Sequence, residues 1–128
     1  MRALLDTHVF VWWALDDRRL SPRVRTIFDD DRAELCFSVV SAWELAIKST
    51  TGRFTALIDL HQSLPMHIER NAMELLPLTL APALGILELP NHRKDPFDRM
   101  LVAQARVEGV PIITADPEIA RYDVERIW

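Results

Sequence analysis

The chain has 128 residues, of which 49% are hydrophobic and 27% are charged, and it contains 3 glycines. A chain of this size buries about two-thirds of the surface that its unfolded form exposes, so we expect one globular domain over residues 1–128, without repeats or a disordered tail. The net charge of -4 excludes a general attraction to nucleic acid, and such a partner would need a local basic patch or a bound metal.

The cysteine content and the apolar runs bear on the compartment. The single cysteine, Cys36, lies in the apolar run "LCFSVV", which indicates a buried thiol and excludes a disulfide within the chain. No apolar run approaches the roughly 20 residues of a membrane span, and Asp6 interrupts the first apolar run. We therefore expect a cytoplasmic protein without a membrane partner.

Apolar periodicity predicts strands and helices that alternate along the chain. Ser21 and Pro22 mark one helix start, Gly109 marks one helix end, and Pro65 predicts a bend. The alternation is typical of an α/β sandwich with a mainly parallel central sheet flanked by helices on both faces. In chain order the expected elements are strand 2–6, helix 7–15, helix 21–30, strand 35–41, helix 41–49, helix 57–71, a weaker strand 73–78, helix 81–89, helix 95–109, strand 110–114 and edge strand 123–128.

Four acidic residues follow the predicted strands. Ligands of open parallel sheets bind beyond the carboxyl ends of the strands, so residues at these places are candidates for a site. Asp6 follows "RALL", and Glu44 lies three residues into the helix after "LCFSVV". Asp98 lies three residues into the helix that starts at Asp95, and Asp116 follows "VPIITA".

Each acid also has a purely structural explanation, which is the simpler one for any acid taken alone. Ser41 and Glu44 have the S-x-x-E spacing of a capping box. Asp95 and Asp116 each precede a proline, as residues that cap a helix start often do. Asp98 would meet the positive end of a helix dipole.

Helix capping does not explain why all four acids should meet at one edge of the sheet. Two carboxylates 4 Å apart repel by about 4 kcal/mol at an effective dielectric constant near 20, so such a cluster calls for a cation. Oxygen ligands without a nearby cysteine select Mg²⁺ or Mn²⁺. A metal held by carboxylates suits hydrolysis of a phosphodiester, because it activates water and stabilises the leaving oxygen.

Four segments together give the chain a resemblance to the PIN-domain ribonucleases, and specifically to the VapC-type toxins of toxin–antitoxin pairs. The segments are "LLDTHV", "SAWELAIK", "HRKDPFDRMLVAQA" and "IITAD", and they match in order, spacing and flanking residues over essentially the whole chain. The resemblance implies that the acidic metal-site residues are Asp6, Glu44, Asp98 and Asp116, with Asp95 as a further acid and Thr7 and Thr114 as polar supports.

The resemblance also implies a fold, an activity and partners. It implies a PIN-like three-layer sandwich and an endoribonuclease that uses Mg²⁺, with Mn²⁺ as a substitute, to cut RNA and so inhibit translation and growth. It implies a homodimer and a VapB-type antitoxin, which together form a heterotetramer or a larger assembly.

The basic residues His92, Arg93, Lys94 and Arg99 have two interpretations of equal weight. They give a negatively charged site the local positive groups that an RNA backbone needs, or they belong to a solvated loop.

Three tryptophans and a stripe of aliphatic side chains leave similar alternatives. Trp12 and Trp13 have helical spacing, which favours a core or dimer face over a platform for stacked bases. Trp43 is a third tryptophan with the same two possible roles. Segment 54–70 forms either an antitoxin groove or ordinary core packing, with a stripe of Leu57, Leu60, Leu64 and Ile68.

Three other functions compete with a ribonuclease. A haloacid dehalogenase-type phosphatase needs a second aspartate two positions after Asp6, where this chain has His8. A receiver-like signalling domain needs a lysine late in the chain, and the last one here is Lys94. A catalytically silent PIN-like scaffold that binds RNA or a partner stays open, although the complete set of acids counts against it.

Overall fold

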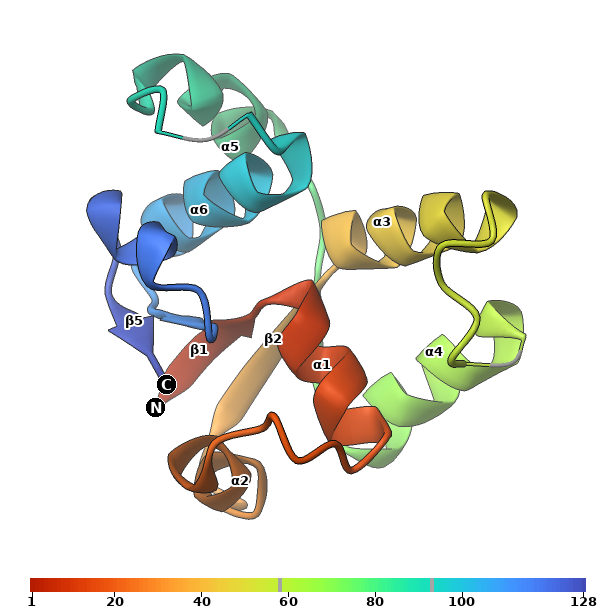
Figure 1. The fold of residues 1–128 in the computed structure, drawn as a ribbon. Helices are drawn as coiled ribbons and strands as arrows, with labels where there is room; N and C mark the ends of the chain where they lie inside the picture. Colours follow the sequence, from red (N-terminus) through yellow and green to blue (C-terminus); the bar gives the residue numbers. More distant parts are fainter. Residues whose placement is uncertain (58, 93) are drawn as a thin grey trace.

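A five-stranded parallel sheet forms the centre of the computed structural model, which describes residues 1–57, 59–92 and 94–128 (Figure 1). The strand order is β3-β2-β1-β4-β5, and each neighbouring pair is parallel. The predicted sheet is therefore confirmed, including its edge strand at the end of the sequence. The strands are β1 (Arg2–Leu5), β2 (Glu34–Ser38), β3 (Glu74–Leu76), β4 (Ile112–Ile113) and β5 (Arg126–Ile127).

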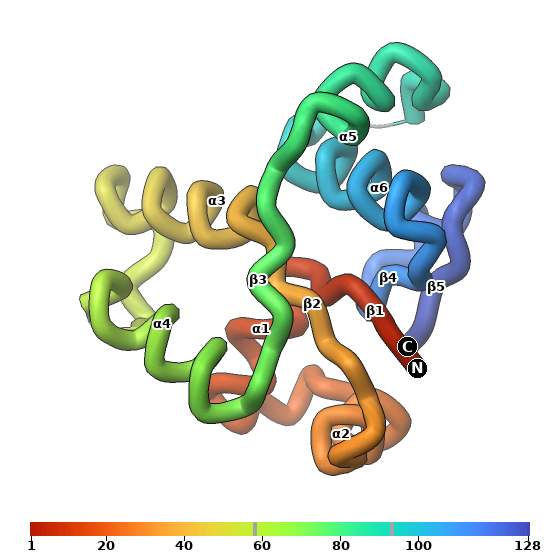
Figure 2. The backbone as a smooth tube through the Cα atoms, turned by 180° about the vertical axis from the view of Figure 1, so that it is seen from behind, coloured from red at the N-terminus to blue at the C-terminus, as the bar shows by residue number. Residues whose placement is uncertain are grey.

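Helices cover both faces of this sheet, and the first and last residues of the described chain lie side by side at one end of it (Figures 1 and 2). None of the helices in the described ranges is long and apolar enough to cross a membrane. The helices are α1 (Thr7–Ala14), α2 (Pro22–Phe28), α3 (Val39–Thr50), α4 (Leu60–Arg70), α5 (Leu80–Gly85) and α6 (Pro96–Glu108), with short 3-10 helices η1 (Ile86–Glu88) and η2 (Pro117–Arg121).

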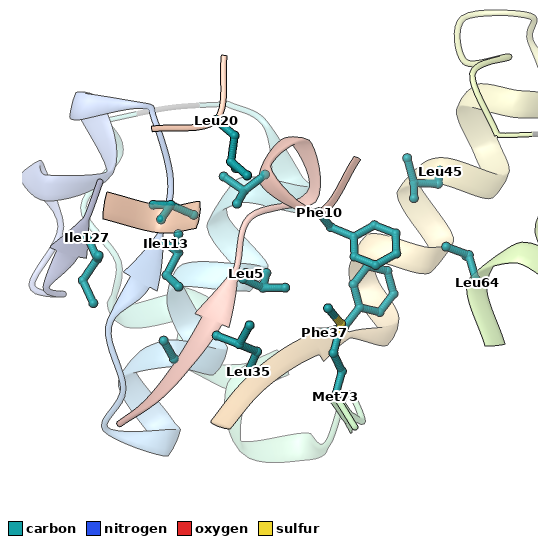
Figure 3. Packing of buried hydrophobic residues seen from close by; sticks show 13 residues of the cluster. Leu5, Phe10, Leu20, Leu35, Phe37, Leu45, Leu64, Met73, Ile113 and Ile127 are labelled. Carbon is teal, nitrogen blue, oxygen red and sulfur yellow. The ribbon is translucent and has the colours of Figure 1, made fainter. Parts of the chain in front are cut away.

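Two hydrophobic cores lie on opposite faces of the sheet because successive strand residues point to opposite sides. The first core joins Ala3, Leu5, Leu35, Phe37, Ile113 and Ile127 to side chains of α1, α2 and α4 (Figure 3). The second core joins Leu4, Cys36, Leu76 and Ile112 to side chains of α6 and η2. Helix α3 contributes Leu45 to the first core and Val40 to the second. These layers confirm the three-layer sandwich.

The boundary between β2 and α3 differs from the prediction. We expected a strand through residue 41 and a capping box of Ser41 and Glu44, and both expectations are wrong. The strand ends at Ser38, whose hydroxyl accepts a hydrogen bond from the N–H of Val40 (3.0 Å) and caps α3. The β-branched residues Val39 and Val40 suggested a strand, but the side chain of Ser38 starts the helix there.

Other predicted ends of helices are confirmed. The Ser21 hydroxyl accepts a hydrogen bond from the N–H of Val24 (3.2 Å), and Pro22 is the first residue of α2. Gly109 ends α6 with a φ of 66°, a left-handed conformation that favours glycine.

Candidate active site

Asp6 lies at the carboxyl end of the central strand β1, and its position depends on the neighbouring strand β4. Its backbone N–H donates to the carbonyl of Ile113 (3.0 Å), and its Oδ2 accepts a hydrogen bond from the Thr114 hydroxyl (2.7 Å). Its other carboxylate oxygen, Oδ1, is buried and accepts no hydrogen bond from any residue that the structure describes. Asp6 therefore presents one oxygen that is held in place and one that is free to bind a ligand.

The surroundings of Asp6 disfavour its negative charge. Burial is the largest effect, and it raises the pKa of this carboxyl group above the ordinary value of 3.8. The charge of Glu44 raises the pKa further, whereas the Thr114 hydrogen bond and His8 lower it. The influence of Glu44 also means that these two carboxylates are close enough to interact.

Glu44 is buried on α3, with 2% of its surface exposed. Its Oε2 accepts a hydrogen bond from Nζ of Lys48 (2.6 Å), one helical turn further along α3. The Thr7 hydroxyl donates to the Ser41 hydroxyl (2.8 Å), and both side chains are buried where α1 packs against α3. This bond connects the residue after Asp6 to the helix that carries Glu44. The supporting role of Thr7 in the site stays a prediction.

Asp95 and Asp98 lie at the start of α6. Oδ1 of Asp95 accepts hydrogen bonds from the N–H groups of Phe97 (2.9 Å) and Asp98 (3.2 Å), so its predicted role as a helix cap is confirmed. Asp98 is the third residue of the helix, as expected. The Phe97 ring lies edge-to-face with the ring of Trp43, 5.3 Å between centroids, so the start of α6 lies beside α3 (Figure 1). The residues next to Asp98 and Glu44 are therefore in contact.

Asp116 lies beyond the carboxyl end of β4, where it caps η2. Its Oδ1 accepts a hydrogen bond from the N–H of Glu118 (3.0 Å), which confirms the predicted cap. Its own N–H donates to the Thr114 hydroxyl (3.1 Å), which in turn donates to Asp6. Thr114 therefore links two of the predicted acids, and its role as a polar support of the site stays a prediction.

The four acids do not form a closed ligand cage. In residues 1–57, 59–92 and 94–128, no three Asp, Glu, His or Cys side chains form a group that could hold a metal ion. Mg²⁺ commonly binds through one or two carboxylates and takes its other ligands from water and a substrate phosphate. The free Oδ1 of Asp6 and the nearby carboxylate of Glu44 fit that mode of binding in their chemistry.

Two of the basic residues near the start of α6, His92 and Arg99, make local contacts. The His92 ring lies edge-to-face with Tyr122, 5.2 Å between centroids, and Nη1 of Arg99 donates to the Pro90 carbonyl (3.0 Å). Lys94 is exposed, and Arg93 lies outside the described residues. Their role in RNA binding stays a prediction.

Several side chains that support the site escaped the sequence analysis. Ser38 donates to the buried amide oxygen of Gln104 (2.6 Å), which joins the end of β2 to α6. In the sequence, this contact is signalled by Gln104, a glutamine within the apolar face of a helix. The sequence pattern predicts only a capping role for Ser41, and the spacing of Lys48 from Glu44 is that of a helical ion pair.

The tryptophans and the predicted aliphatic stripe differ in their burial. Trp12 and Trp13 pack against the first core, as favoured, whereas Trp43 is 59% exposed. The stripe of Leu57, Leu60, Leu64 and Ile68 also packs against this core. Between α3 and α4 there is in addition a mainly apolar groove, lined in part by Ala42, Ala46, Phe54, Leu57, Leu60 and Leu64.

Comparison with known proteins places this fold in a family. Ribonuclease VapC22 of Mycobacterium tuberculosis is 28% identical over 120 residues, which cover 93% of this chain and 90% of that protein. A VapBC2 structure from Rickettsia felis, bound to a DNA fragment from its promoter, has a TM-score of 0.74 at 14% identity and covers 100% of this chain and 99% of that one. DNA-bound VapBC from Salmonella typhimurium has a TM-score of 0.73 at 17% identity, with 99% and 97% covered. The family model of the PIN domain matches residues 3–125, and the chain therefore belongs to the PIN-domain family.

Proposed function

We propose that this protein is a metal-dependent endoribonuclease of the VapC type, the toxin of a toxin–antitoxin pair. The observation that carries the proposal is the carboxylate of Asp6 at the end of the central strand, with one oxygen bonded to Thr114 and the other buried without a partner. A buried carboxylate in this state costs free energy, and a bound cation offsets that cost. The similarity to a ribonuclease along 93% of the chain supports RNA as the substrate.

Asp6, Glu44, Asp98 and Asp116 would hold Mg²⁺, for which Mn²⁺ substitutes, and Asp95 would support them from the cap of α6. When bound, the ion supplies an activated water and stabilises negative charge on the leaving oxygen. The chain itself positions the acids. Thr114 orients Asp6, the Thr7–Ser41 hydrogen bond fixes α1 against α3, and the start of α6 favours the negative charge of Asp98.

The substrate would approach past the basic residues just before α6 and in its first turn. Lys94 is exposed and would contact phosphate, with His92, Arg93 and Arg99 as further candidates. The overall charge of -4 makes such local contacts necessary. We expect cytoplasmic action, in which cleavage of RNA stops translation and growth.

A VapB-type antitoxin would hold the toxin inactive. Solved structures of the same fold contain VapBC pairs, and the groove between α3 and α4 has the apolar lining that an amphipathic helix needs. Leu80, Leu84 and Leu87 are exposed by 72%, 54% and 84%, which supports a further protein interface such as that of a homodimer. Two toxins and their antitoxins would form a heterotetramer or a larger assembly.

The test is cleavage of RNA by the purified protein with Mg²⁺ or Mn²⁺ and in excess chelator. We expect cleavage only with metal, and none from Glu44→Gln or Asp98→Asn purified in the same way. Asp31→Asn, which removes an exposed carboxylate before β2, serves as the matched control and should cleave normally. Cleavage that persists in chelator, or that the variants retain, contradicts the proposal. Binding of RNA without any cleavage would favour the silent scaffold.

A further inference from the structure

Lys48 forms an ion pair with the buried side chain of Glu44. Its Nζ lies 2.6 Å from Oε2 of Glu44, and the pair has the i,i+4 spacing that brings side chains together on one helix face. The side chain of Glu44 is 3% exposed and that of Lys48 is 28% exposed. The ammonium group therefore acts as the counter-cation of a carboxylate that water hardly reaches.

We propose that Lys48 occupies the place of the metal at Glu44 in the metal-free protein and that a divalent ion binds Glu44 only by displacing it. The inference deepens the proposed function and depends on it, because it assigns a competitor for one ligand of that site.

The two partners differ in their freedom to move. Glu44 is buried, and the Thr7–Ser41 hydrogen bond holds its helix one turn earlier. The backbone of Lys48 is fixed because its carbonyl accepts hydrogen bonds from the N–H groups of Arg53 (2.9 Å) and Phe54 (3.1 Å). Its side chain, however, is a flexible four-carbon stem with a strongly hydrated end, so the ammonium can turn to solvent. Displacement thus moves Lys48 and leaves Glu44 in place.

Competition between the Lys48 ammonium group and the metal ion has opposite effects on the metal-free and the metal-bound protein. Without metal, the ion pair stabilises a buried carboxylate that would otherwise destabilise the fold. With metal, the protein gives up that ion pair, so the affinity for the ion is lower than the acids alone would give. Removing the charge of Lys48 should therefore weaken the metal-free fold and tighten metal binding.

The experiment titrates Mn²⁺ into the metal-free full-length protein at neutral pH and follows free Mn²⁺ by electron paramagnetic resonance. Lys48→Met keeps an apolar stem and removes the charge, and we expect its Kd for Mn²⁺ to fall about tenfold or more, the factor that corresponds to one charge-assisted hydrogen bond. Lys48→Arg keeps the charge and should bind Mn²⁺ no more tightly than the parent. Melting temperatures should show a lower value for Lys48→Met in chelator and a larger rise on adding Mn²⁺.

Arg53→Met is the matched control, because it removes one positive charge near the same helix end from an exposed side chain that contacts Thr51 and not Glu44. Its Kd should stay within about twofold of the parent value, since exposed charges are screened. Lys48→Gln replaces Lys48→Met if the latter does not fold. Unchanged or weaker Mn²⁺ binding in the neutral variant overturns the role of Lys48 and leaves the proposed function intact. A parent protein that binds no Mn²⁺ overturns the metal site itself, and this inference with it.

Discussion

Replacing Asp6 with asparagine should stabilise the metal-free protein at neutral pH while abolishing RNA cleavage. Asparagine keeps an oxygen that can accept the Thr114 hydrogen bond, which is 2.7 Å long in the parent. It removes a negative charge that is buried, that leaves Oδ1 without a partner, and that lies close enough to Glu44 for the two charges to interact. Binding sites often retain such destabilising groups because function needs them.

The expected gain is about 1–2 kcal/mol. A buried polar atom without a partner costs about 1–3 kcal/mol, and a charged one costs more. The neutral amide NH₂ group that takes the unpartnered position keeps part of this cost, so the gain is the difference that the lost charge makes, and we take the lower part of the range. For a domain of this size each kcal/mol corresponds to about 3–5 °C, so the melting temperature in chelator should rise by about 3–10 °C.

The gain should depend on pH with a definite sign. The pKa of Asp6 is raised above 3.8, so the folded state holds this proton more tightly than the unfolded state. The stability that this tighter proton binding contributes is complete below pH 3.8, and it is lost as the pH rises through the folded-state pKa of Asp6. The Asp6→Asn variant has no carboxyl group to ionise and so does not lose this stability. The difference in stability between variant and parent should therefore be small at about pH 4 and should grow until the parent carboxyl group is ionised.

The assay is thermal unfolding of parent and variant in chelator between about pH 4 and pH 8, followed by circular dichroism, with RNA cleavage in Mg²⁺ measured in parallel. Asp31→Asn removes an equal charge from an exposed position and should show no such dependence. A variant that melts below the parent at neutral pH, or an advantage that does not change with pH, would refute the account of a buried, destabilising carboxylate.

Two further predictions concern α6 and the second core. Asp95→Ala should lower stability by about 0.5–2 kcal/mol with partial loss of cleavage, since it removes two capping hydrogen bonds. Asp98→Asn should abolish cleavage and change the melting temperature less than Asp95→Ala does. If instead Asp95→Ala abolishes cleavage and Asp98→Asn mainly lowers stability, the roles of helix cap and metal ligand are exchanged. Burial, followed by the hydrogen bond to Glu74, raises the pKa of the Cys36 thiol to about 12. Alkylation by iodoacetamide at about pH 8 should therefore be at least roughly 100-fold slower in the folded than in the urea-unfolded protein, as mass spectrometry would show, and equal rates would contradict this burial.

The local features of this protein were predictable from its sequence. The Ser21 and Asp95 caps, the Gly109 helix end and the Asp116 cap each depend on groups within four residues of one another. Alternating runs of apolar residues likewise predicted the parallel sheet, because a strand buried on both faces has few alternatives. The four motifs indicated the family, which is confirmed, and predicted which acids form the site.

The tertiary structure decided how those acids are held. The Asp6–Thr114 hydrogen bond joins residues 108 apart in the chain, and the Thr7–Ser41 bond joins residues 34 apart. No local pattern encodes such contacts, because they form only when β4 pairs with β1 and α1 packs on α3. The same packing buries Glu44 and so gives Lys48 a partner that water hardly reaches. Residue types and spacing thus determined which groups are present, whereas long-range pairing determined their burial and their partners from distant parts of the chain.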